Sequence, residues 1–592
     1  MREGRDTERQ RRSRARRYER EDAREYRRRP DRRSDGQRRR RDGGSKNLPL
    51  VLSGIIIAAI AIVILANSLF KETGGSSKKA DIAEQLGISS ENGVALILDG
   101  EVTDEPVLVQ DDRPFISIAE ANSIYGNFYY DSEEGHLLVT GASNTVEGAS
   151  GTDFITEGDE VYISLDFLQR FAPIYYELYS DPSRLELMTK AEQVTETSVK
   201  ENAKMRVSAD KKAAVLLELD KKDAVYVLDE NEDWAQIRYQ GVTGYVQIKA
   251  LSDKREETTT PLEGGAEADA SYTKNLRDHK IVLGFHNLAV KDANSYLDEA
   301  AKNVKGMNVI APTWFSLSGT GGDLYDLGST EYVEKAHGMG YEVWGVVDNF
   351  NQETDTNAVL SHTSTRQVLE QNIINAALTY GMEGINIDFE QLPGETGDDF
   401  SQFLRELSIY TRANGLVLSI DNYVPQDYTD FYRRDIQGRV ADYVIIMGYD
   451  EHTSASEEAG SVASLSFVTQ GIEDTLKEVP AEQVINAIPF YTRKWAEEGG
   501  TLSCESLGMR EAQAFISDNG AKTTWDADAC QNYASFEKNG VNYSIWLEDA
   551  ESISSKLAVM AAHDLAGVGC WKLTQETPDI WDTIATYYPS GS

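Results

Sequence analysis

The chain has 592 residues, which is long enough for several domains. Its net charge is −39, but residues 1–47 contain 20 Lys and Arg against 10 Asp and Glu, so residues 48–592 carry −49. This acidic excess argues against nucleic acid as a partner of residues 48–592 and is compatible with a neutral glycan. The three cysteines exclude a disulfide framework; Cys504 and Cys530 flank one segment and could pair or stay reduced.

Residues 1–47 are rich in arginine and almost free of apolar side chains. Such a segment cannot bury a core, so we predict a disordered tail. Its charge either fixes the orientation of a membrane segment or binds anionic lipid or nucleic acid.

Residues 48–70 form an uncharged run of 23 residues dominated by Ile, Leu, Val and Ala. This length crosses a hydrocarbon core of about 30 Å, so we predict one transmembrane helix. A cleaved signal peptide is the alternative, but its basic region would be unusually long and no clear small-x-small site follows Ala66. The positive residues precede the span, which predicts a cell-membrane protein with a cytoplasmic N-terminus and extracellular C-terminal domains. Residues 71–91 read as a polar linker.

Residues 92–190 contain an internal repeat. Asp-Arg-Pro-Phe-Ile-Ser-Ile at 112–118 is matched 47 positions later by Asp-Glu-Val-Tyr-Ile-Ser-Leu at 159–165, and each copy precedes a helical stretch and an aromatic strand. We therefore predict a small duplicated α+β module. It resembles the module named for the N-terminal domain of copper amine oxidases, but His136 is its only histidine and no copper chemistry is implied. Its role is either contact with the cell wall or that of a spacer.

Residues 194–252 alternate short strands with turns and include Trp234 and a closing Gly-Tyr-Val. This spacing predicts a small β-barrel. The segment resembles a bacterial SH3 domain, in which Trp234 and Tyr245 would either bind cell-wall peptide or pack in the core. Residues 253–276 have the composition of a linker.

Residues 277–592 alternate strand-like and helix-like runs, which indicates parallel βαβ units. There are eight candidate strands, the number that a closed (β/α)8 TIM barrel needs. They are residues 280–285, 307–312, 342–347, 384–390, 416–421, 443–449, 483–489 and 567–573.

The long gap before the eighth strand contains an insertion. Residues 532–536 and 543–547 flank Lys-Asn-Gly, a hairpin signal. We expect the insertion to form a wall of the active-site cleft.

Residues 384–390, Gly-Ile-Asn-Ile-Asp-Phe-Glu, alternate apolar and polar side chains. On a strand this alternation places Asn386, Asp388 and Glu390 on one face. A polar face can simply be solvated, but the flanking helical runs favour a strand covered on its outer side. In α/β barrels active sites lie at the carboxyl ends of the strands, where this face ends.

Residues 383–390 resemble the DGxDxDxE signature of glycoside hydrolase family 18, the chitinase-like (β/α)8 barrels. Glu383 and Asn386 replace two of its aspartates, whereas Asp388 and Glu390 are intact. The Asn variant is similar to the peptidoglycan-directed branch, which includes spore-cortex-lytic N-acetylglucosaminidases.

Two further matches support this resemblance. Residues 447–450, from Met447 to Asp450, are similar to the family's M-x-Y-[DN] motif, and Trp571 lies where the family keeps a tryptophan at the floor of the sugar subsite. Taken singly, Tyr449 and Trp571 are also explained as packing residues.

Cleavage of a glycosidic bond requires a proton donor, and Glu390 is the candidate for general acid and later base. The resemblance implies that the substrate's 2-acetamido oxygen replaces an enzyme nucleophile. It implies further that Asp388 orients the acetamide and that Tyr449 and Asp450 bind it, with Met447 and Trp571 completing the substrate site. Asn386 could still donate a hydrogen bond to Asp388, whose charge should raise the pKa of Glu390. No cofactor or metal site is expected.

These features predict a membrane-anchored extracellular glycosidase that acts on N-acetylglucosamine-containing cell-wall glycan, with peptidoglycan preferred over chitin. The alternative is a non-catalytic, lectin-like wall scaffold. A membrane-anchored signalling protein with a basic tail is a third hypothesis. The intact Asp388 and Glu390 favour the enzyme, because a pure binding protein does not need an acid beside a second carboxylate.

Overall fold

The computed structural model describes residues 76–88, 93–259, 262–267 and 271–589. The predicted tail and the predicted membrane span, residues 48–70, lie outside this part. Within it, no helix has the length and apolar character needed to cross a membrane. Two compact units are present: one contains the barrel together with Tyr129–Val146, and the other contains Glu147–Ala268 and the described residues up to Phe128.

Each copy of the internal repeat is a strand that ends in a capping serine and continues as a helix. Strand β4 (Arg113–Ser117) leads into α4 (Ile118–Ile124), and β9 (Glu160–Ser164) leads into α5 (Leu165–Phe171). The hydroxyl oxygens of Ser117 and Ser164 accept hydrogen bonds from the backbone N–H three residues later. The two strands pair antiparallel between β3 (Val107–Gln110) and β8 (Phe154–Glu157). The predicted repeat therefore forms two equivalent structural units, while its relation to copper amine oxidases stays a prediction.

A second sheet of this unit brings the start and the end of the predicted module together. Its order is β10 (Tyr175–Tyr179), β11 (Arg184–Met188), β1 (Ala95–Leu98) and β2 (Glu101–Thr103), and β1 runs parallel to β11. Helix α3 (Ile82–Gln85) precedes these strands.

The SH3-like segment is an antiparallel seven-stranded sheet. Trp234 is buried and Tyr245 is half-buried, so the first is a packing residue and the second keeps an accessible edge. The strand β18 lies inside the stretch that the sequence assigns to a linker, because it pairs with β12. The strands are β12 (Gln193–Ser198), β13 (Ala203–Arg206), β14 (Val215–Leu219), β15 (Ala224–Glu230), β16 (Trp234–Tyr239), β17 (Val242–Gln247) and β18 (Glu256–Thr259).

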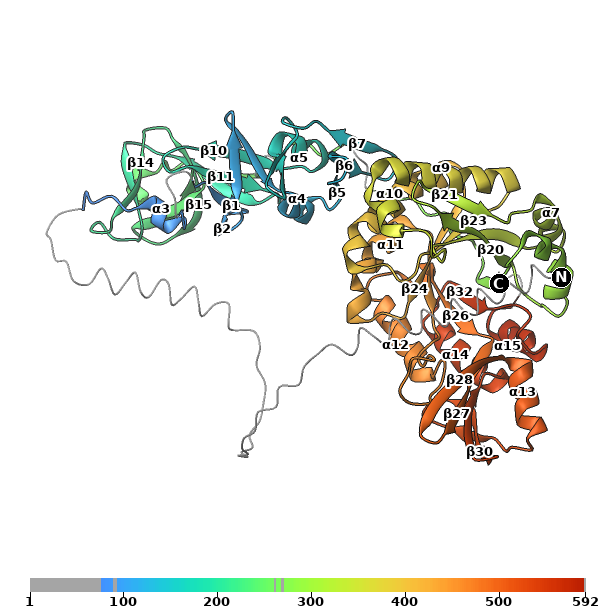
Figure 1. Cartoon of the computed structure of the whole chain (residues 1–592). Helices are drawn as coiled ribbons and strands as arrows, with labels where there is room; N and C mark the ends of the chain where they lie inside the picture. The colour runs from blue at the N-terminus through green and yellow to red at the C-terminus, as the bar shows by residue number, and fades with distance from the viewer. Residues whose placement is uncertain (1–75, 89–92, 260–261, 268–270, 590–592) are drawn as a thin grey trace, which may run out of the picture. The chain divides into compact units, whose positions relative to one another are not determined.

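The barrel unit contains a closed barrel of eight parallel strands (Figure 1). Closure comes from the pairings of β19 with both β20 and β32. All eight predicted strands are confirmed; their ends differ from the prediction by at most two residues, except that β20 runs six residues further, to Ser318. They are β19 (Ile281–His286), β20 (Val309–Ser318), β22 (Glu342–Asp348), β23 (Gly384–Asp388), β24 (Val417–Tyr423), β25 (Tyr443–Met447), β26 (Val484–Pro489) and β32 (Gly567–Trp571).

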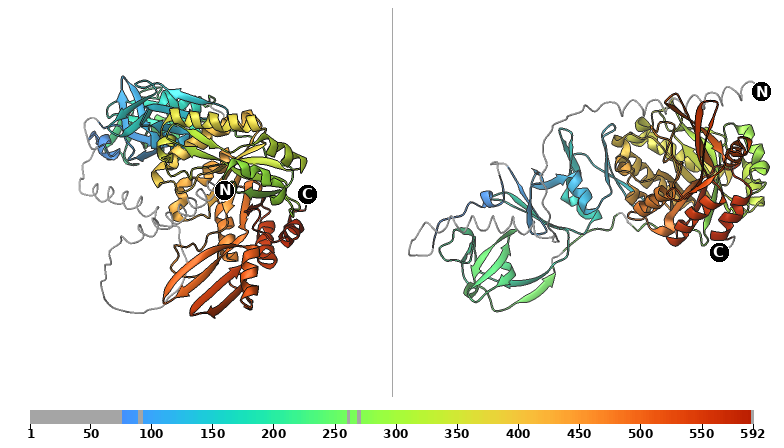
Figure 2. Two further views of the ribbon diagram at one scale, coloured as in Figure 1. Left: turned by 45° about the vertical axis from the view of Figure 1, so that its right-hand side comes forward. Right: turned by 90° about the horizontal axis from the view of Figure 1, so that it is seen from below.

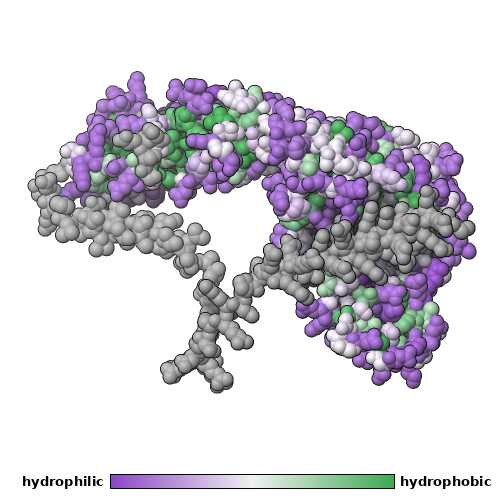
Figure 3. All heavy atoms as spheres, in the orientation of Figure 1, coloured by the Kyte–Doolittle hydropathy of each residue, from purple (hydrophilic) through white to green (hydrophobic). Residues whose placement is uncertain are grey.

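Helices surround the barrel strands, as the two further views show (Figure 2). The face drawn in Figure 3 is mostly hydrophilic over the barrel, as the acidic composition leads one to expect. A short strand, β21 (Asp323–Asp326), extends β20 as a hairpin. The helices are α6 (Leu297–Ala300), α7 (Thr330–Gly338), α8 (Thr356–Ser361), α9 (Thr363–Tyr380), α10 (Gly397–Ala413), α11 (Arg434–Val440), α12 (Leu465–Thr475), α14 (Ala550–Ala562) and α15 (Asp579–Tyr587).

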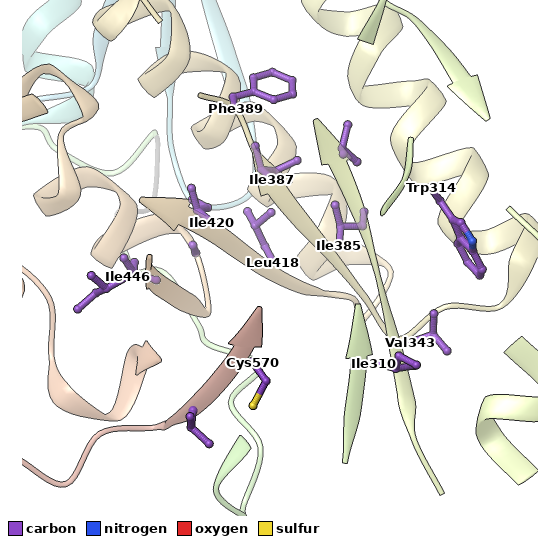
Figure 4. Close-up of a cluster of buried hydrophobic side chains, with 14 of the residues drawn as sticks. Ile310, Trp314, Val343, Ile385, Ile387, Phe389, Leu418, Ile420, Ile446 and Cys570 are labelled. Carbon is purple, nitrogen blue, oxygen red and sulfur yellow. The ribbon is translucent and has the colours of Figure 1, made fainter. Parts of the chain in front are cut away.

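The main core lies between the strands and the helices. Ile385, Ile387 and Phe389 point outward from β23 into this core, beside Leu418 and Ile420 of the neighbouring strand (Figure 4). The ring of Phe389 stacks on that of Phe403 from α10 at 5.7 Å between centroids. The alternating face of β23 is thereby confirmed: its apolar residues anchor the helices, and its polar residues are left to face the barrel interior.

The insertion before β32 is an antiparallel five-stranded sheet with one helix. Asn539 and Gly540 both have positive φ, 56° and 82°, as the predicted two-residue turn requires. Cys504 and Cys530 lie in this insertion and do not form a disulfide. Its elements are β27 (Tyr491–Glu498), β28 (Thr501–Gly508), α13 (Met509–Asp518), β29 (Thr524–Asp526), β30 (Gln531–Lys538) and β31 (Val541–Leu547).

A hairpin from the predicted repeat module belongs to the barrel unit. It includes β6 (His136–Thr140) and carries Asp131, which is fully buried. One oxygen of Asp131 accepts hydrogen bonds from the backbone N–H and the hydroxyl of Thr363 at 2.6 and 2.7 Å. These groups lie at the first turn of α9, whose own N-cap residue, His362, makes no side-chain capping bond. The hairpin therefore caps a barrel helix from outside the predicted domain.

A buried ion pair extends this contact. The guanidinium of Arg366 donates to Glu406 at 3.0 Å and to the hydroxyl of Tyr129 at 3.1 Å, and both charged side chains are almost wholly buried. Gln402 donates to Thr140 of the hairpin at 2.7 Å. Residues 129–146 thus join the buried polar network of the barrel unit, and a fragment that begins after them would lose the partners that Asp131, Tyr129 and Thr140 give to Thr363, Arg366 and Gln402.

Replacing Asp131 by Ala should destabilise the barrel unit by about 1–3 kcal/mol, because two donors of the first turn of α9 lose their acceptor. Although burial opposes it, hydrogen bonds from Thr363 and the charge of Arg366 lower the pKa of Asp131. The loss of stability in Asp131→Ala should therefore be largest above the ordinary pKa of the carboxyl group. It should disappear as the pH falls through the lowered pKa of the folded state. Thermal unfolding of the full chain measures it, with the exposed neighbour Glu133→Ala as control; equal unfolding temperatures would contradict the capping role.

Candidate active site

Glu390 lies two residues beyond the end of β23 and is fixed by the neighbouring strand. Its backbone N–H donates to the side-chain oxygen of Asn349 at 2.9 Å, and the amide of Asn349 donates back to the Glu390 carbonyl at the same distance. Asn349 directly follows β22, which pairs with β23 up to Asp348 and Asp388. This reciprocal pair of bonds positions the carboxyl at the carboxyl end of the barrel.

Glu390 as a residue is half-buried, and its carboxyl accepts a hydrogen bond from the hydroxyl of Tyr423 at 2.7 Å. Burial of the carboxyl, together with the charges of Asp450 and Asp348, raises its pKa to about 7 against the opposing effect of the Tyr423 hydrogen bond. A carboxyl group with this pKa is about half protonated at neutral pH. It can give a proton and later take one back.

Asp388 ends β23 and is buried, with its Oδ1 lacking a hydrogen-bond partner among the described residues. Burial raises its pKa well above the ordinary range, and Glu390, Asp421 and Asp348 add to the effect. The charge of Glu390 thus raises the pKa of Asp388. The expected effect of the Asp388 charge on Glu390 is not found, because burial and then the charges of Asp450 and Asp348 raise the pKa of Glu390.

Asn386 does not donate to Asp388, contrary to our expectation. Its amide donates to the hydroxyl of Ser419 at 3.1 Å and to a carboxyl oxygen of Asp421 at 2.9 Å, both on β24. The reason is the register of the parallel ladder, in which Asn386 lies opposite Ser419. The amide therefore links two strands instead of two residues of one strand.

The Met447–Asp450 motif extends from β25 to the loop that follows it. Met447 is buried, and Tyr449 is half-buried. Burial raises the pKa of Tyr449 well above its usual range, with added effects from Asp421 and Asp388, so the phenol lies near both carboxyls. Asp450 has a positive φ of 62° and accepts hydrogen bonds from the Tyr491 hydroxyl at 2.6 Å and from Arg493 at 2.9 Å.

Trp571 ends β32, where it pairs with Pro489 of β26. Its ring is half-buried and lies 5.5 Å from that of Phe285, centroid to centroid. It packs against the core cluster inside the barrel, so packing is part of its role, and part of the residue stays accessible.

The structure thus brings five predicted site residues together at the carboxyl ends of the strands: Asn386, Asp388, Glu390, Tyr449 and Asp450. Met447 and Trp571 end strands on the same side of the barrel. The position of Glu383 is different, because its carboxylate accepts from the Val343 N–H at 2.9 Å and contacts His337, near the start of β23. The replacement of the signature's first aspartate by Glu383 therefore lies at the opposite end of the strand from Glu390.

Sequence reasoning missed six residues of this group. On β24, Ser419, Asp421 and Tyr423 lie at alternate positions, with Ile420 between the first two and Asn422 between the last two, so part of the pattern seen on β23 was available. Asp348 and Asn349 give a weaker signal at the end of β22. Tyr491 and Arg493 give none, because only the tertiary fold brings the insertion to Asp450. The missed residues are Asp348, Asn349, Asp421, Tyr423, Tyr491 and Arg493.

Comparison with known families agrees with this geometry. Residues 346–576 match the family described as Glycosyl hydrolases family 18, and residues 199–253 match the Bacterial SH3 domain. The barrel is a glycosyl hydrolase family 18 domain. The second match agrees with the seven-stranded sheet described above.

Several relatives of the family 18 domain come from Bacillus, and others come from organisms such as Arabidopsis thaliana. The putative sporulation-specific glycosylase YdhD of Bacillus subtilis is 30% identical over 233 residues, 38% of this chain and 54% of that protein. The cortical fragment-lytic enzyme of Bacillus anthracis is 23% identical over 244 residues, 40% and 56% of the two chains. The crystal structure of the Bacillus cereus spore cortex-lytic enzyme SleL aligns with a TM-score of 0.48 at 20% identity, over 55% of this chain and 78% of that one. The chain spans about half the length of the two curated relatives.

Replacing Tyr423 by Phe should raise the pKa of Glu390 above about 7, because the lost hydrogen bond favours the ionised carboxylate. Carboxyl ¹³C NMR of the full chain over a pH series measures it. Tyr428→Phe is the matched control, since Tyr428 lies in the next loop and is 77% exposed. An unchanged or lower pKa in Tyr423→Phe would contradict the assigned hydrogen bond.

Proposed function

We propose that the family 18 domain is a retaining glycosidase that hydrolyses N-acetylglucosamine-containing cell-wall glycan by a substrate-assisted mechanism. The observation that carries the proposal is Glu390, a carboxyl with a pKa of about 7 held beside the buried Asp388. Family membership supports the reaction class.

In this proposal protonated Glu390 gives its proton to the glycosidic oxygen as the bond to the anomeric carbon breaks. The carbonyl oxygen of the substrate's 2-acetamido group attacks the same carbon and forms a cyclic oxazolinium ion. The Glu390 carboxylate then takes a proton from water, whose oxygen opens the ring with net retention. The hydrogen bond from Tyr423 stabilises the carboxylate between these two steps.

Asp388 would accept the acetamide N–H through its unpaired oxygen and so orient the acetamide for attack. Tyr449 would hold the acetamide oxygen. Asp450, fixed by Tyr491 and Arg493, would bind a neighbouring hydroxyl, and Trp571 would pack against the sugar. Each of these roles uses a group already positioned at the strand ends.

Peptidoglycan is the proposed substrate, ahead of chitin. The support is that the relatives include cortical fragment-lytic enzymes and that an SH3 domain precedes the barrel. We propose further that residues 48–70 anchor the chain in the cell membrane with the barrel outside. That part rests on the apolar sequence of residues 48–70 and the basic residues before it.

The full chain should release reducing N-acetylglucosamine ends from purified peptidoglycan, and Glu390→Gln should reduce the rate by at least about 10²-fold, because the amide cannot give a proton. A reducing-end assay on peptidoglycan and, separately, on chitin oligomers measures both. Glu395→Gln, an exposed position in the following loop, is the control. If wild type and Glu390→Gln both bind the glycan and neither cleaves it, the lectin-like alternative is correct.

Removal of the N-acetyl groups tests the attacking atom. The full chain should lose nearly all activity on chemically de-N-acetylated glycan and regain it after re-acetylation, because the amine left behind has no carbonyl oxygen to attack. The same reducing-end assay, with matched chain lengths, reports the result. Equal rates on acetylated and deacetylated chains would exclude substrate assistance.

A further inference from the structure

Asp421 is a buried carboxyl on β24 to which the family signature gives no role. It is 5% exposed and accepts a hydrogen bond from the Asn386 amide at 2.9 Å. Asn386 itself is fully buried, and its own side-chain oxygen has no hydrogen-bond partner among the described residues. A buried amide with one orphan end is oriented by what holds its other end, here Asp421 and Ser419.

The groups that face Asp421 are themselves acidic. Asp388 and Glu390 face it from β23, Tyr449 faces it from the loop after β25, and Asp348 on β22 acts on both carboxyls of β23. Among the described residues, no Lys or Arg forms an ion pair with Asp388, Glu390 or Asp421; the nearby Arg493 is paired with Asp450. Carboxylates crowded in this way cannot all be ionised, so some must keep a proton.

We propose that Asp421 is a positioning residue that keeps a second proton beside the catalytic acid. The Asn386–Asp421 pair, which joins two strands, then supplies the protonated carboxyl group that a carboxyl side chain at position 386 would supply on one strand. The proposal rests on the proposed glycosidase function. A neutral Asp421 does not oppose the charge that Glu390 acquires when it gives up its proton.

Titration behaviour agrees with this geometry. Burial, together with the charge of Glu390, raises the pKa of Asp421 to about 8, although the Asn386 hydrogen bond opposes the shift. Glu390, with a pKa of about 7, therefore ionises before Asp421 does. The apparent values belong to the coupled group, so removing one member changes the other.

The test compares the pH dependence of kcat/KM for the full chain and four variants. Asp421→Asn keeps an acceptor for Asn386 and stays neutral, as protonated Asp421 does while Glu390 ionises, so the alkaline limb should stay in place. Asn386→Asp adds a carboxyl and should move it to higher pH. The double variant Asn386→Asp/Asp421→Asn restores the number of carboxyls and should return the limb toward wild type. Ser419→Ala removes the other acceptor of Asn386 without changing charge and should leave the limb in place.

A purely structural role predicts a different pattern: Asp421→Asn and Ser419→Ala would both lower kcat, and the double variant would not return the limb toward wild type. That result would overturn the proposal. So would a shift of the limb to lower pH in Asp421→Asn, because Asp421 would then be ionised while Glu390 titrates.

Thermal unfolding over a pH series tests the proton on Asp421 without requiring activity. A carboxyl whose folded pKa is raised favours the folded state below its unfolded pKa and loses that contribution as the pH rises through the folded value. The unfolding temperature of Asp421→Asn relative to wild type should therefore rise between pH 5 and pH 8, while that of Ser419→Ala should not depend on pH. A flat difference for Asp421→Asn would overturn the proposal. If wild type hydrolyses nothing, the proposed function fails, and this series still decides whether Asp421 keeps a proton.

Discussion

Repulsion among buried carboxyl groups is the constraint on which this site depends. Asp388, Glu390 and Asp421 meet at the ends of two adjacent strands, and among the described residues none of them is paired with a basic side chain. Their pKa values rise because the barrel excludes water and because each charge would oppose the next. The fold therefore keeps carboxyl groups protonated at neutral pH at the place where a glycosidic oxygen needs a proton.

The surrounding structure fixes these groups through neutral hydrogen bonds instead of cations. Asn349 holds the backbone of Glu390, Tyr423 holds its carboxyl, and Asn386 connects β23 with Asp421. A nearby Lys or Arg would have lowered the pKa of Glu390 and left it ionised at neutral pH. The guanidinium of Arg493 is instead bound to Asp450, at the exposed edge of the site.

Much of this architecture could be predicted from local sequence patterns. The eight strands and the Asn539–Gly540 turn follow from periodicity and turn chemistry, and so does the polar face of β23. Strand register, in contrast, decided that Asn386 contacts β24, and no local pattern gives register between strands 30 residues apart. The capping of α9 by Asp131 could not be predicted either, because Asp131 and Thr363 are separated by 232 positions and belong to different predicted domains.

The most direct test of the account is the titration of Glu390 and Asp388 in the wild-type full chain, followed by carboxyl ¹³C NMR with each signal assigned by substitution. The account predicts a midpoint near 7 for Glu390 while Asp388 still carries its proton. Midpoints near the ordinary value of 4.5 for Glu390 and 3.8 for Asp388 would contradict it, because both carboxyls would then be ionised at neutral pH and neither could serve as the acid.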